Sequence, residues 1–488
     1  MNQPLSKNAP DTCVAESTPH RAWIAGCVGA LGGLLFGYDW VVIGGAKSFY
    51  EAYFHIHDPM LEAWVMSCAL LGCLIGTLIS GALSDRKGRR WMLMVSAVLF
   101  AITSLGTAAS STVVAFVLWR ILGGCAIGAA SEVAPLFLAE IAPTELRASF
   151  VSLNQMAIVF GILAAQCVNW FIARPVPAGI NAVAMVASWN AQWGWRWMFG
   201  ITAIPSTLFL LTTFWIPESP RWLLANFRVT EAMYAFQRLG FSDLESTAIR
   251  QTLMHGRVIE SEASRLPPSK GSGRNSQKRV FLRILLLGML IAILQQWCGI
   301  NIIFSYAQDV FVQAGYTVSQ SLFQIVLTGA VNLLFTLLAL RFVDRLGRRI
   351  LLLGGLASLS GIYILLGWMI RAHQHGAPVA ALVLAAIAVY AMTLAPVSWV
   401  VIAEIYPARI RARSMAITVA ALWIASFALT SSFPLIRASI GIYRTFWLYA
   451  IICACGACML ALWLPETRGY SLENIEGKLY RQPHRESA

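Results

Sequence analysis

Two charged residues stand inside long apolar stretches of the sequence. Asp39 interrupts a stretch near residues 22–46, and Arg120 interrupts another near 113–140. If the two stretches are helices that cross a membrane in opposite directions, a rise of about 1.5 Å per residue places Asp39 and Arg120 at a similar depth. Charges at such a depth are costly and occur where they have a partner and a function. A carboxylate beside an arginine stays ionised, whereas separation from that arginine in an apolar site favours its protonated form. The pair therefore predicts a site that loads and releases a proton, with a structural ion pair as the alternative.

Other polar side chains in apolar stretches are uncharged. An amide in such a stretch is costly without a polar partner, so each requires either a hydrogen bond to another helix or a ligand. Residues of this kind include Gln155, Gln295, Gln296, Asn301 and Asn332. Glu132 is a further acid in the stretch that holds Arg120, and the sequence leaves three roles open: an extra proton site, a substrate contact or a cavity-lining group.

The elements that must position these residues are membrane-spanning helices. Hydrophobic residues make up 58% of the 488 residues and charged residues 12%, more apolar character than one water-soluble core requires. About twelve stretches are each about 20 residues long, enough to cross a hydrocarbon layer about 30 Å thick. They lie near 22–46, 61–83, 91–110, 113–140, 149–173, 195–216, 281–313, 318–342, 350–371, 378–406, 411–435 and 443–464.

The basic residues give the helices a direction. Most of the 36 Lys and Arg residues fall in loops on one side of this map, which the positive-inside rule makes cytoplasmic. The net charge of +13 therefore reflects topology and not nucleic-acid binding. An even number of helices then places both termini in the cytoplasm. The first 20 residues lack the features of a secretory signal, so we expect the first helix to remain in the mature protein.

The sequence is duplicated. Residues 85–90 (DRKGRR) reappear as 344–349 (DRLGRR), 139–143 (AEIAP) as 403–407 (AEIYP), and 217–219 (PES) as 465–467 (PET). The spacing is about half the chain and the order is kept, so we expect two six-helix halves. The predicted fold is an all-α membrane protein of twelve transmembrane helices in two pseudo-symmetric halves. Its segments are a cytoplasmic tail (1–21), an N-terminal half (22–216), a cytoplasmic linker with short helices (217–280), a C-terminal half (281–464) and a cytoplasmic tail (465–488).

An ordered set of motifs resembles the sugar porter family of the major facilitator superfamily. The set consists of residues 81–90 (GALSDRKGRR), 120–124 (RILGG), 217–222 (PESPRW), 295–301 (QQWCGIN) and 465–469 (PETRG). It is similar to that of bacterial xylose:proton symporters and facilitative glucose carriers and covers nearly the whole chain. The resemblance implies alternating access, in which the two halves rock around a central substrate.

The resemblance also implies roles for the polar residues. Gln155, Gln295, Gln296, Asn301, Asn332 and Trp399 match positions that contact sugar in the family, and Tyr306 is a further candidate contact. Amides that donate and accept, beside an aromatic face, suit an uncharged polyhydroxyl ligand. Proton-coupled members carry Asp at the position of Asp39, where passive members usually carry an amide. Ser305, Ala395 and Leu422 depart from the family pattern, which implies a site with fewer donors and a different monosaccharide, a deoxysugar or a polyol as the substrate.

Charged residues at the cytoplasmic helix ends form matched sets in the two halves. Carboxylates and guanidinium groups make directed pairs, and the resemblance implies that they latch the cytoplasmic side until it opens. Charges that only set topology are the alternative, because exposed pairs contribute about 0–1 kcal/mol. The set is Asp85, Arg86, Arg89, Glu140, Arg147, Glu218, Asp344, Arg345, Arg348, Glu404, Arg411 and Glu466.

The resulting prediction is a proton-coupled symporter of a monosaccharide or polyol in the cell (inner) membrane. We expect it to use the proton gradient as its energy source, to need no cofactor and no metal, to bind no nucleic acid and to act as a monomer in the lipid bilayer. A passive uniporter would lack the proton site, so Asp39 separates the two. A transport-inactive sugar sensor usually has a longer cytoplasmic tail. An enzyme would need convergent catalytic groups, and no nucleophile, base or metal set is present in the sequence.

Overall fold

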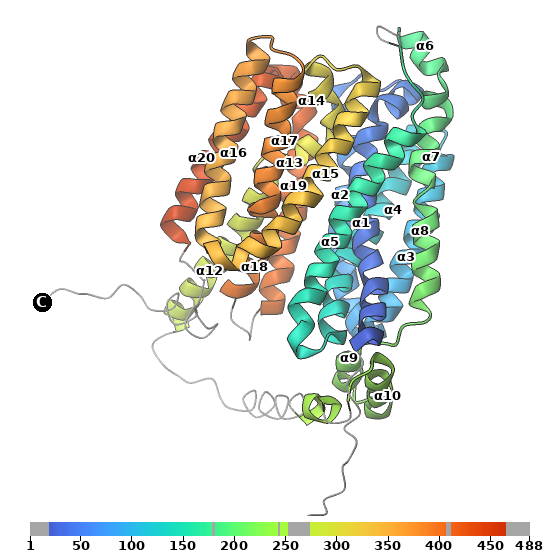
Figure 1. Ribbon diagram of the computed structural model, residues 1–488, viewed down its shortest axis with the longest axis vertical. Helices are drawn as coiled ribbons and strands as arrows, with labels where there is room; N and C mark the ends of the chain where they lie inside the picture. Colours follow the sequence, from blue (N-terminus) through green and yellow to red (C-terminus); the bar gives the residue numbers. More distant parts are fainter. Residues whose placement is uncertain (1–18, 178–180, 243–244, 252–273, 407–410, 465–488) are drawn as a thin grey trace, which may run out of the picture.

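The computed structural model describes residues 19–177, 181–242, 245–251, 274–406 and 411–464. Within these ranges every regular element is a helix, as the sequence predicts. Figure 1 shows two sets of long helices side by side, with the short helices α9 (Pro220–Ala225) and α10 (Val229–Leu239) beyond one end of the first set.

The first set is the N-terminal half. Its helices are α1 (Pro19–Phe54), α2 (Pro59–Lys87), α3 (Arg89–Ala109), α4 (Val113–Ile141), α5 (Arg147–Ile172), α6 (Ala182–Ala187), α7 (Trp195–Gly200) and α8 (Ala203–Thr213). Side chains cap the N-termini of several of these helices. Asp58 accepts a hydrogen bond from the Leu61 amide at the start of α2, and the Thr112 hydroxyl accepts one from the Ala115 amide at the start of α4.

The second set is the C-terminal half. Its helices are α12 (Arg274–Trp297), α13 (Ile300–Ser305), α14 (Ala307–Gln313), α15 (Val318–Leu346), α16 (Arg348–Arg371), α17 (Ala377–Met392), α18 (Leu394–Ile405), α19 (Arg411–Ile440) and α20 (Ile442–Trp463). The duplicated loops have the same geometry in both halves. Gly88 joins α2 to α3 with φ 107°, and Gly347 joins α15 to α16 with φ 91°, a region that only glycine adopts readily.

Among the described residues, eleven helical stretches are long and apolar enough to span a membrane. The expected sixth stretch (195–216) is the exception, because it is divided into α7 and α8 by a turn at Ile201 and Thr202. Two expected boundaries also shift. The first helix begins at Pro19, before residue 22, and α12 begins at Arg274, inside the segment expected to be linker.

Two predicted helices of the C-terminal half are interrupted near their centres. Gly299, with φ 84°, separates α12 from α13, and Tyr306 separates α13 from α14. Thr393 separates α17 from α18, three residues before Pro396, which has no N–H to continue the helix. Broken helices of this kind leave main-chain groups available within a membrane protein and mark binding sites in transporters.

The two ends of the molecule differ in charge. One end, called here the basic end, carries residues 84–90, the start of α5, α9 and α10; the opposite end is called the far end and carries the α1–α2 and α14–α15 connections. The described chain starts and finishes at the basic end. Trp23 packs on Phe150 at the start of α5, and Arg349 donates a hydrogen bond to the main-chain oxygen of Ala461 near the end of α20.

Glycines allow α2 and α4 to lie in close contact. Gly72 and Gly76 face α4, while Gly124 and Gly128 face α2, each pair spaced by four residues. A methyl group at Gly124 would lie 1.9 Å from the main-chain oxygen of Ala69, so no larger residue fits there without moving a helix.

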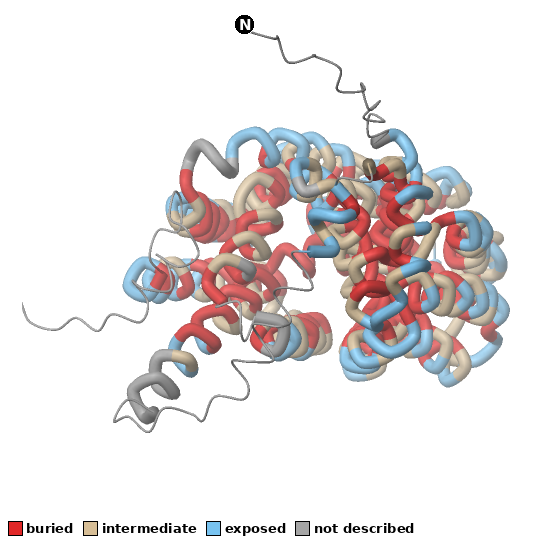
Figure 2. The backbone as a smooth tube through the Cα atoms, turned by 90° about the horizontal axis from the view of Figure 1, so that it is seen from below, coloured by how far each residue is buried: buried red, intermediate tan, exposed pale blue. Residues whose placement is uncertain are grey.

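The outer surface of the helix sets is apolar. Leu78, Leu105, Leu118 and Leu462 are more than half exposed, although they belong to long helices. Figure 2 shows that the exposed residues lie around the outside of the helices and the buried ones where helices face each other. Such an apolar outer face suits lipid, so the chain is a multi-pass membrane protein.

Candidate functional site

Asp39 and Arg120 form a buried ion pair between α1 and α4. The Arg120 Nη1 atom donates to both Asp39 carboxylate oxygens, at 2.9 and 2.8 Å, and Nη2 lies 3.4 Å from the Asp39 main-chain oxygen. The two side chains are only 10% and 4% exposed. The predicted pairing of these residues is therefore present in the structure, while its role in proton transfer stays a prediction.

Neighbouring groups fix this pair. The Arg120 guanidinium lies 5.4 Å from the centre of the Phe199 ring, on α7. Beside Asp39, the Tyr38 hydroxyl donates to the Met198 main-chain oxygen at 3.2 Å. The pair is thus enclosed by α1, α4 and α7, away from bulk water, where its electrostatic interaction is strong.

The predicted amides of the C-terminal half cluster at the break between α12 and α13. Asn301 donates a hydrogen bond to the side-chain oxygen of Gln296, and both residues are buried. Gln295 is also buried, and its side-chain oxygen has no hydrogen-bond partner among the described residues. A buried acceptor without a partner is costly, and a ligand hydroxyl could supply the missing donor.

The other predicted contacts lie on neighbouring helices. Asn332 is buried on α15, whereas Trp399 on α18 and Gln155 on α5 are half-buried. Helix α15 packs against both α5 and α18, and α18 also packs against α12. Asn332 is therefore on a helix that contacts both the helix of Gln155 and the helix of Trp399. The hydrogen bond seen between two of the six predicted sugar contacts in the described part of the chain is that of Asn301 with Gln296.

Tyr306 and Glu132 have partners outside this set of amides. The Tyr306 hydroxyl donates to the Thr430 main-chain oxygen at 2.9 Å, and its ring packs on Phe433. The Ser80 hydroxyl donates to Glu132 at 2.6 Å, so this acid faces α2. In this conformation the Tyr306 hydroxyl is occupied within the protein, and the three roles considered for Glu132 remain open.

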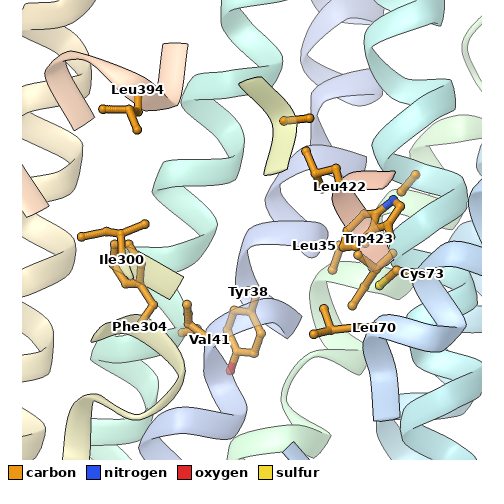
Figure 3. Close-up of a cluster of buried hydrophobic side chains, with 14 of the residues drawn as sticks. Leu35, Tyr38, Val41, Leu70, Cys73, Ile300, Phe304, Leu394, Leu422 and Trp423 are labelled. Carbon is orange, nitrogen blue, oxygen red and sulfur yellow. The ribbon is translucent and has the colours of Figure 1, made fainter. Parts of the chain in front are cut away.

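An aromatic group between the two halves was not predicted from the sequence. Trp423 on α19 lies 5.8 Å from Trp40 and 6.2 Å from Phe36 on α1, measured between ring centres. The Trp423 indole nitrogen is buried without a hydrogen-bond partner in the described part of the chain. Figure 3 shows Leu422 and Trp423 in the buried cluster that includes Leu35 and Cys73. With 18 tryptophans in the chain, residue type alone does not distinguish this one.

The predicted charged set of the N-terminal half comes together at the basic end. Arg89 binds Glu140 through Nε and Nη2 at 3.1–3.2 Å, and its Nη1 donates to Asp85 at 2.8 Å. The main-chain amides of Arg89 and Arg90 donate to one Glu218 oxygen at 2.9 and 3.0 Å. Burial raises the pKa of the Glu218 carboxyl, against the opposing effect of these N–H groups.

The remaining members of this predicted set are less engaged or not described. Arg86 is exposed, and Arg147 is half-buried with its Nε atom lacking a partner among the described residues. In the second half, Arg348 lies 3.5 Å from Glu404, the counterpart of the Arg89 pair with Glu140. The residues outside the described part, by side chain or entirely, are Asp344, Arg345, Arg411 and Glu466.

Known proteins share both this sequence pattern and this arrangement of helices. A family model described as sugar (and other) transporter matches residues 25–479. The D-xylose-proton symporter of Escherichia coli (strain K12) is 34% identical over 484 residues, covering 92% of this chain and 94% of that protein. The arabinose-proton symporter of Bacillus subtilis (strain 168) is 32% identical over 451 residues, covering 92% and 93%.

Solved structures agree with the sequence relatives. The inward open conformation of the xylose transporter XylE from E. coli matches with a TM-score of 0.79 at 32% identity, over 94% of this chain and 99% of that one. The same transporter bound to 6-bromo-6-deoxy-D-glucose matches with a TM-score of 0.74, also at 32% identity, over 94% and 99%. The predicted major facilitator fold is confirmed, and the chain belongs to the sugar transporter family of that superfamily.

Proposed function

We propose that this chain carries a monosaccharide or a related polyol across the membrane together with a proton, by alternating access. The observation that carries the proposal is the buried contact between Asp39 and Arg120. A carboxylate held by an arginine in one conformation and freed in another can take up a proton on one side and release it on the other. Relatives with about one third identity are named as proton symporters of xylose, arabinose and galactose.

The substrate class is supported by the amides and the aromatic group. Gln295, Gln296 and Asn301 offer donors and acceptors without charge, and Trp423 offers an apolar face for the CH groups of a ring. Leu422, next to Trp423, offers no hydrogen bond. A site with fewer donors than a typical hexose or pentose pocket suits a different monosaccharide, a deoxysugar or a polyol.

The proposed orientation puts the basic end in the cytoplasm. Arg86 and Lys87 at the end of α2, and the arginines at the start of α16, follow the positive-inside rule. Both termini are then cytoplasmic, and the membrane is the inner membrane of a bacterial cell. The proposal includes no cofactor and no metal, since the proton gradient supplies the energy, and it takes the monomer as the working unit.

The test is uptake into proteoliposomes with an imposed pH gradient. Purified protein is supplied with a panel of radiolabelled pentoses, hexoses, deoxysugars and polyols, and accumulation above the external concentration is measured. We expect one class to accumulate and Asp39→Asn to equilibrate that compound without accumulating it. Glu231→Gln is an acid-to-amide control, since Glu231 is exposed and pairs with Arg228 outside the helix bundle. Full accumulation by Asp39→Asn would exclude coupling through Asp39, and no transport of any compound would exclude the proposed function.

A further inference from the structure

Five charged residues gather at the far end, away from the Asp39 pair and from the amides. Lys47 and Glu51 lie on α1, Glu62 on α2, Asp309 on α14 and Arg437 on α19. The first three belong to the N-terminal half and the last two to the C-terminal half. We call these five residues the far-end charge cluster.

Two ion pairs of the cluster join the halves. Lys47 Nζ lies 3.1 and 3.0 Å from the two Asp309 carboxylate oxygens. Arg437 Nη2 lies 3.2 and 3.0 Å from the two Glu62 oxygens. The Lys47 side chain is only 4% exposed and Glu62 only 11%, so these are not freely solvated surface charges. Pairs with so little water around them contribute more than exposed pairs do.

Each cation also has a partner in its own half. Lys47 lies 3.1 Å from Glu51, one turn further along α1, and 3.0 Å from Glu62 on α2. Arg437 lies 2.6 Å from Asp309. If the halves separate at this end, both pairs between halves break, but neither cation loses its last carboxylate. Separation therefore avoids the large penalty of an unpaired buried charge, which normally makes such pairs hard to break.

The surrounding contacts show that this end is closed in the present conformation. The Ser48 amide donates to the Gln308 side-chain oxygen at 3.2 Å, and the Gln166 side chain donates to Thr328 at 3.2 Å. Among described residues, the hydrogen bonds and ion pairs that join the halves all lie toward the far end. Helix α14, which carries Asp309, is a seven-residue segment separated from α13 by the break at Tyr306.

We propose that the far-end charge cluster is the gate of the outer side, and that it works by exchange of ion-pair partners. With the basic end open, the pairs of Lys47 with Asp309 and of Arg437 with Glu62 hold the outer side shut. When the outer side opens, Lys47 keeps Glu51 and Glu62, and Arg437 keeps Asp309. This inference rests on the proposed alternating access and adds residues that set the balance between its two end states.

The exchange model makes two neighbouring acids behave differently. Glu62→Gln removes the partner of Arg437 from the opposite half, and so weakens the closed state; after separation Lys47 still keeps Glu51, and Arg437 still keeps Asp309. Glu51→Gln removes a partner of Lys47 from the same half, and so weakens both states alike. Both acids contact Lys47 and the chemical change is the same, which makes Glu51→Gln the matched control. Asp309→Asn is not used, because it would leave Arg437 without a carboxylate of its own half when the halves separate.

The experiment measures how often the far end opens. Ser305→Cys places a thiol at a buried position, 7% exposed in the native serine, next to Tyr306, whose ring centre lies 5.7 Å from Lys47 Nζ. Intact cells are treated with a membrane-impermeant maleimide, and labelling of the purified protein is followed in time. The protein without Ser305→Cys gives the background from native cysteines. Met60→Cys, at a residue 68% exposed near the far end, shows that this end faces the reagent.

In the Ser305→Cys background we expect Glu62→Gln to speed labelling by about threefold or more, because it shifts the population toward the open outer state. Glu51→Gln should stay within about twofold of the parent, because it biases neither state. Equal rates in the parent and in Glu62→Gln would overturn the proposal, as would an equal acceleration by Glu51→Gln. Labelling needs no transported sugar, so a failure of the proposed symport in the uptake assay remains distinguishable from a failure of the gate.

Discussion

Arg120 holds the Asp39 carboxylate through a single nitrogen: Nη1 donates to both carboxylate oxygens, at 2.9 and 2.8 Å. A forked pair would use two nitrogens, and here Nε has no partner among the described residues. A small displacement of α1 against α4 would therefore release both bonds together. The Phe199 ring, 5.4 Å from the guanidinium, would remain a favourable neighbour of the cation after release. This arrangement suits a pair that must be both made and broken.

The first prediction concerns the stability of this pair. Arg120→Gln should lower the free energy of unfolding by about 3–5 kcal/mol at neutral pH, because it leaves the Asp39 carboxylate buried and unpaired. The double variant Asp39→Asn, Arg120→Gln has no buried charge and should regain most of this loss. Thermal unfolding of the purified variants in detergent measures both effects. A double variant no more stable than Arg120→Gln alone would show that the unpaired charge is not the cause.

The second prediction concerns substrate recognition at Leu422. This residue stands where the family usually has an amide, beside Trp423. Leu422→Gln should strengthen binding of a fully hydroxylated monosaccharide by up to about tenfold, because one net hydrogen bond contributes about 0.5–1.5 kcal/mol. The KM for uptake and the Kd from tryptophan fluorescence both report this change. Leu422→Met, similar in volume but without an amide, is the control and should not improve either value.

The features that could be predicted from the sequence are those that depend on short segments. The length of the apolar stretches, the basic loops on one side and the duplicated motifs predict the fold and the order of the helices. The depths of Asp39 and Arg120 in their stretches predict that the two residues pair. The break between α7 and α8 was missed because hydropathy does not register a turn between apolar residues. Pro205, three residues after Thr202 and without an N–H to donate, is the local signal that could have indicated it.

The far-end charge cluster could not be predicted from the sequence. Its charges lie near the ends of apolar stretches, where isolated charges in contact with water are ordinary. Arg437 and Glu62 are 375 residues apart, and they meet only because the two halves pack against each other. The same holds for Trp423, whose partners Phe36 and Trp40 belong to the other half. Contacts between halves depend on the conformation, which periodicity and composition do not specify.

The third prediction is a pH dependence at the basic end. Burial raises the pKa of Glu218 above its ordinary value of about 4.5, so the folded protein holds this proton more tightly than the unfolded chain. The contribution of Glu218 to stability must therefore fall as the pH rises from that ordinary value through the raised one. Glu218→Gln imitates the protonated form. Its stability relative to the native protein should increase with pH over this range.

Unfolding of the native protein and of Glu218→Gln, followed side by side from about pH 4 to pH 8, measures this difference. Changes common to both proteins cancel, so other titrating groups do not obscure the result. Glu231→Gln is a useful control, because Glu231 is exposed and its pKa is shifted in the opposite direction by Arg228. If the stability of Glu218→Gln relative to the native protein fell as the pH rose, the prediction would be wrong.

The fourth prediction separates helix propensity from helix contact by comparing two glycines. Both Gly124 on α4 and Gly354 on α16 lie inside helices, where alanine is intrinsically favoured by about 1 kcal/mol. A methyl group at Gly354 meets nothing within 4 Å, whereas one at Gly124 would lie 1.9 Å from the Ala69 main-chain oxygen. Gly354→Ala should therefore leave the unfolding temperature unchanged or raise it. Gly124→Ala should lower it, because α2 and α4 must move apart and lose their close packing. Helix propensity favours both substitutions equally, so a lower unfolding temperature for Gly124→Ala alone can only come from the contact with α2. A higher unfolding temperature for both variants would show that α2 and α4 are not held as closely as the distance between Gly124 and Ala69 indicates.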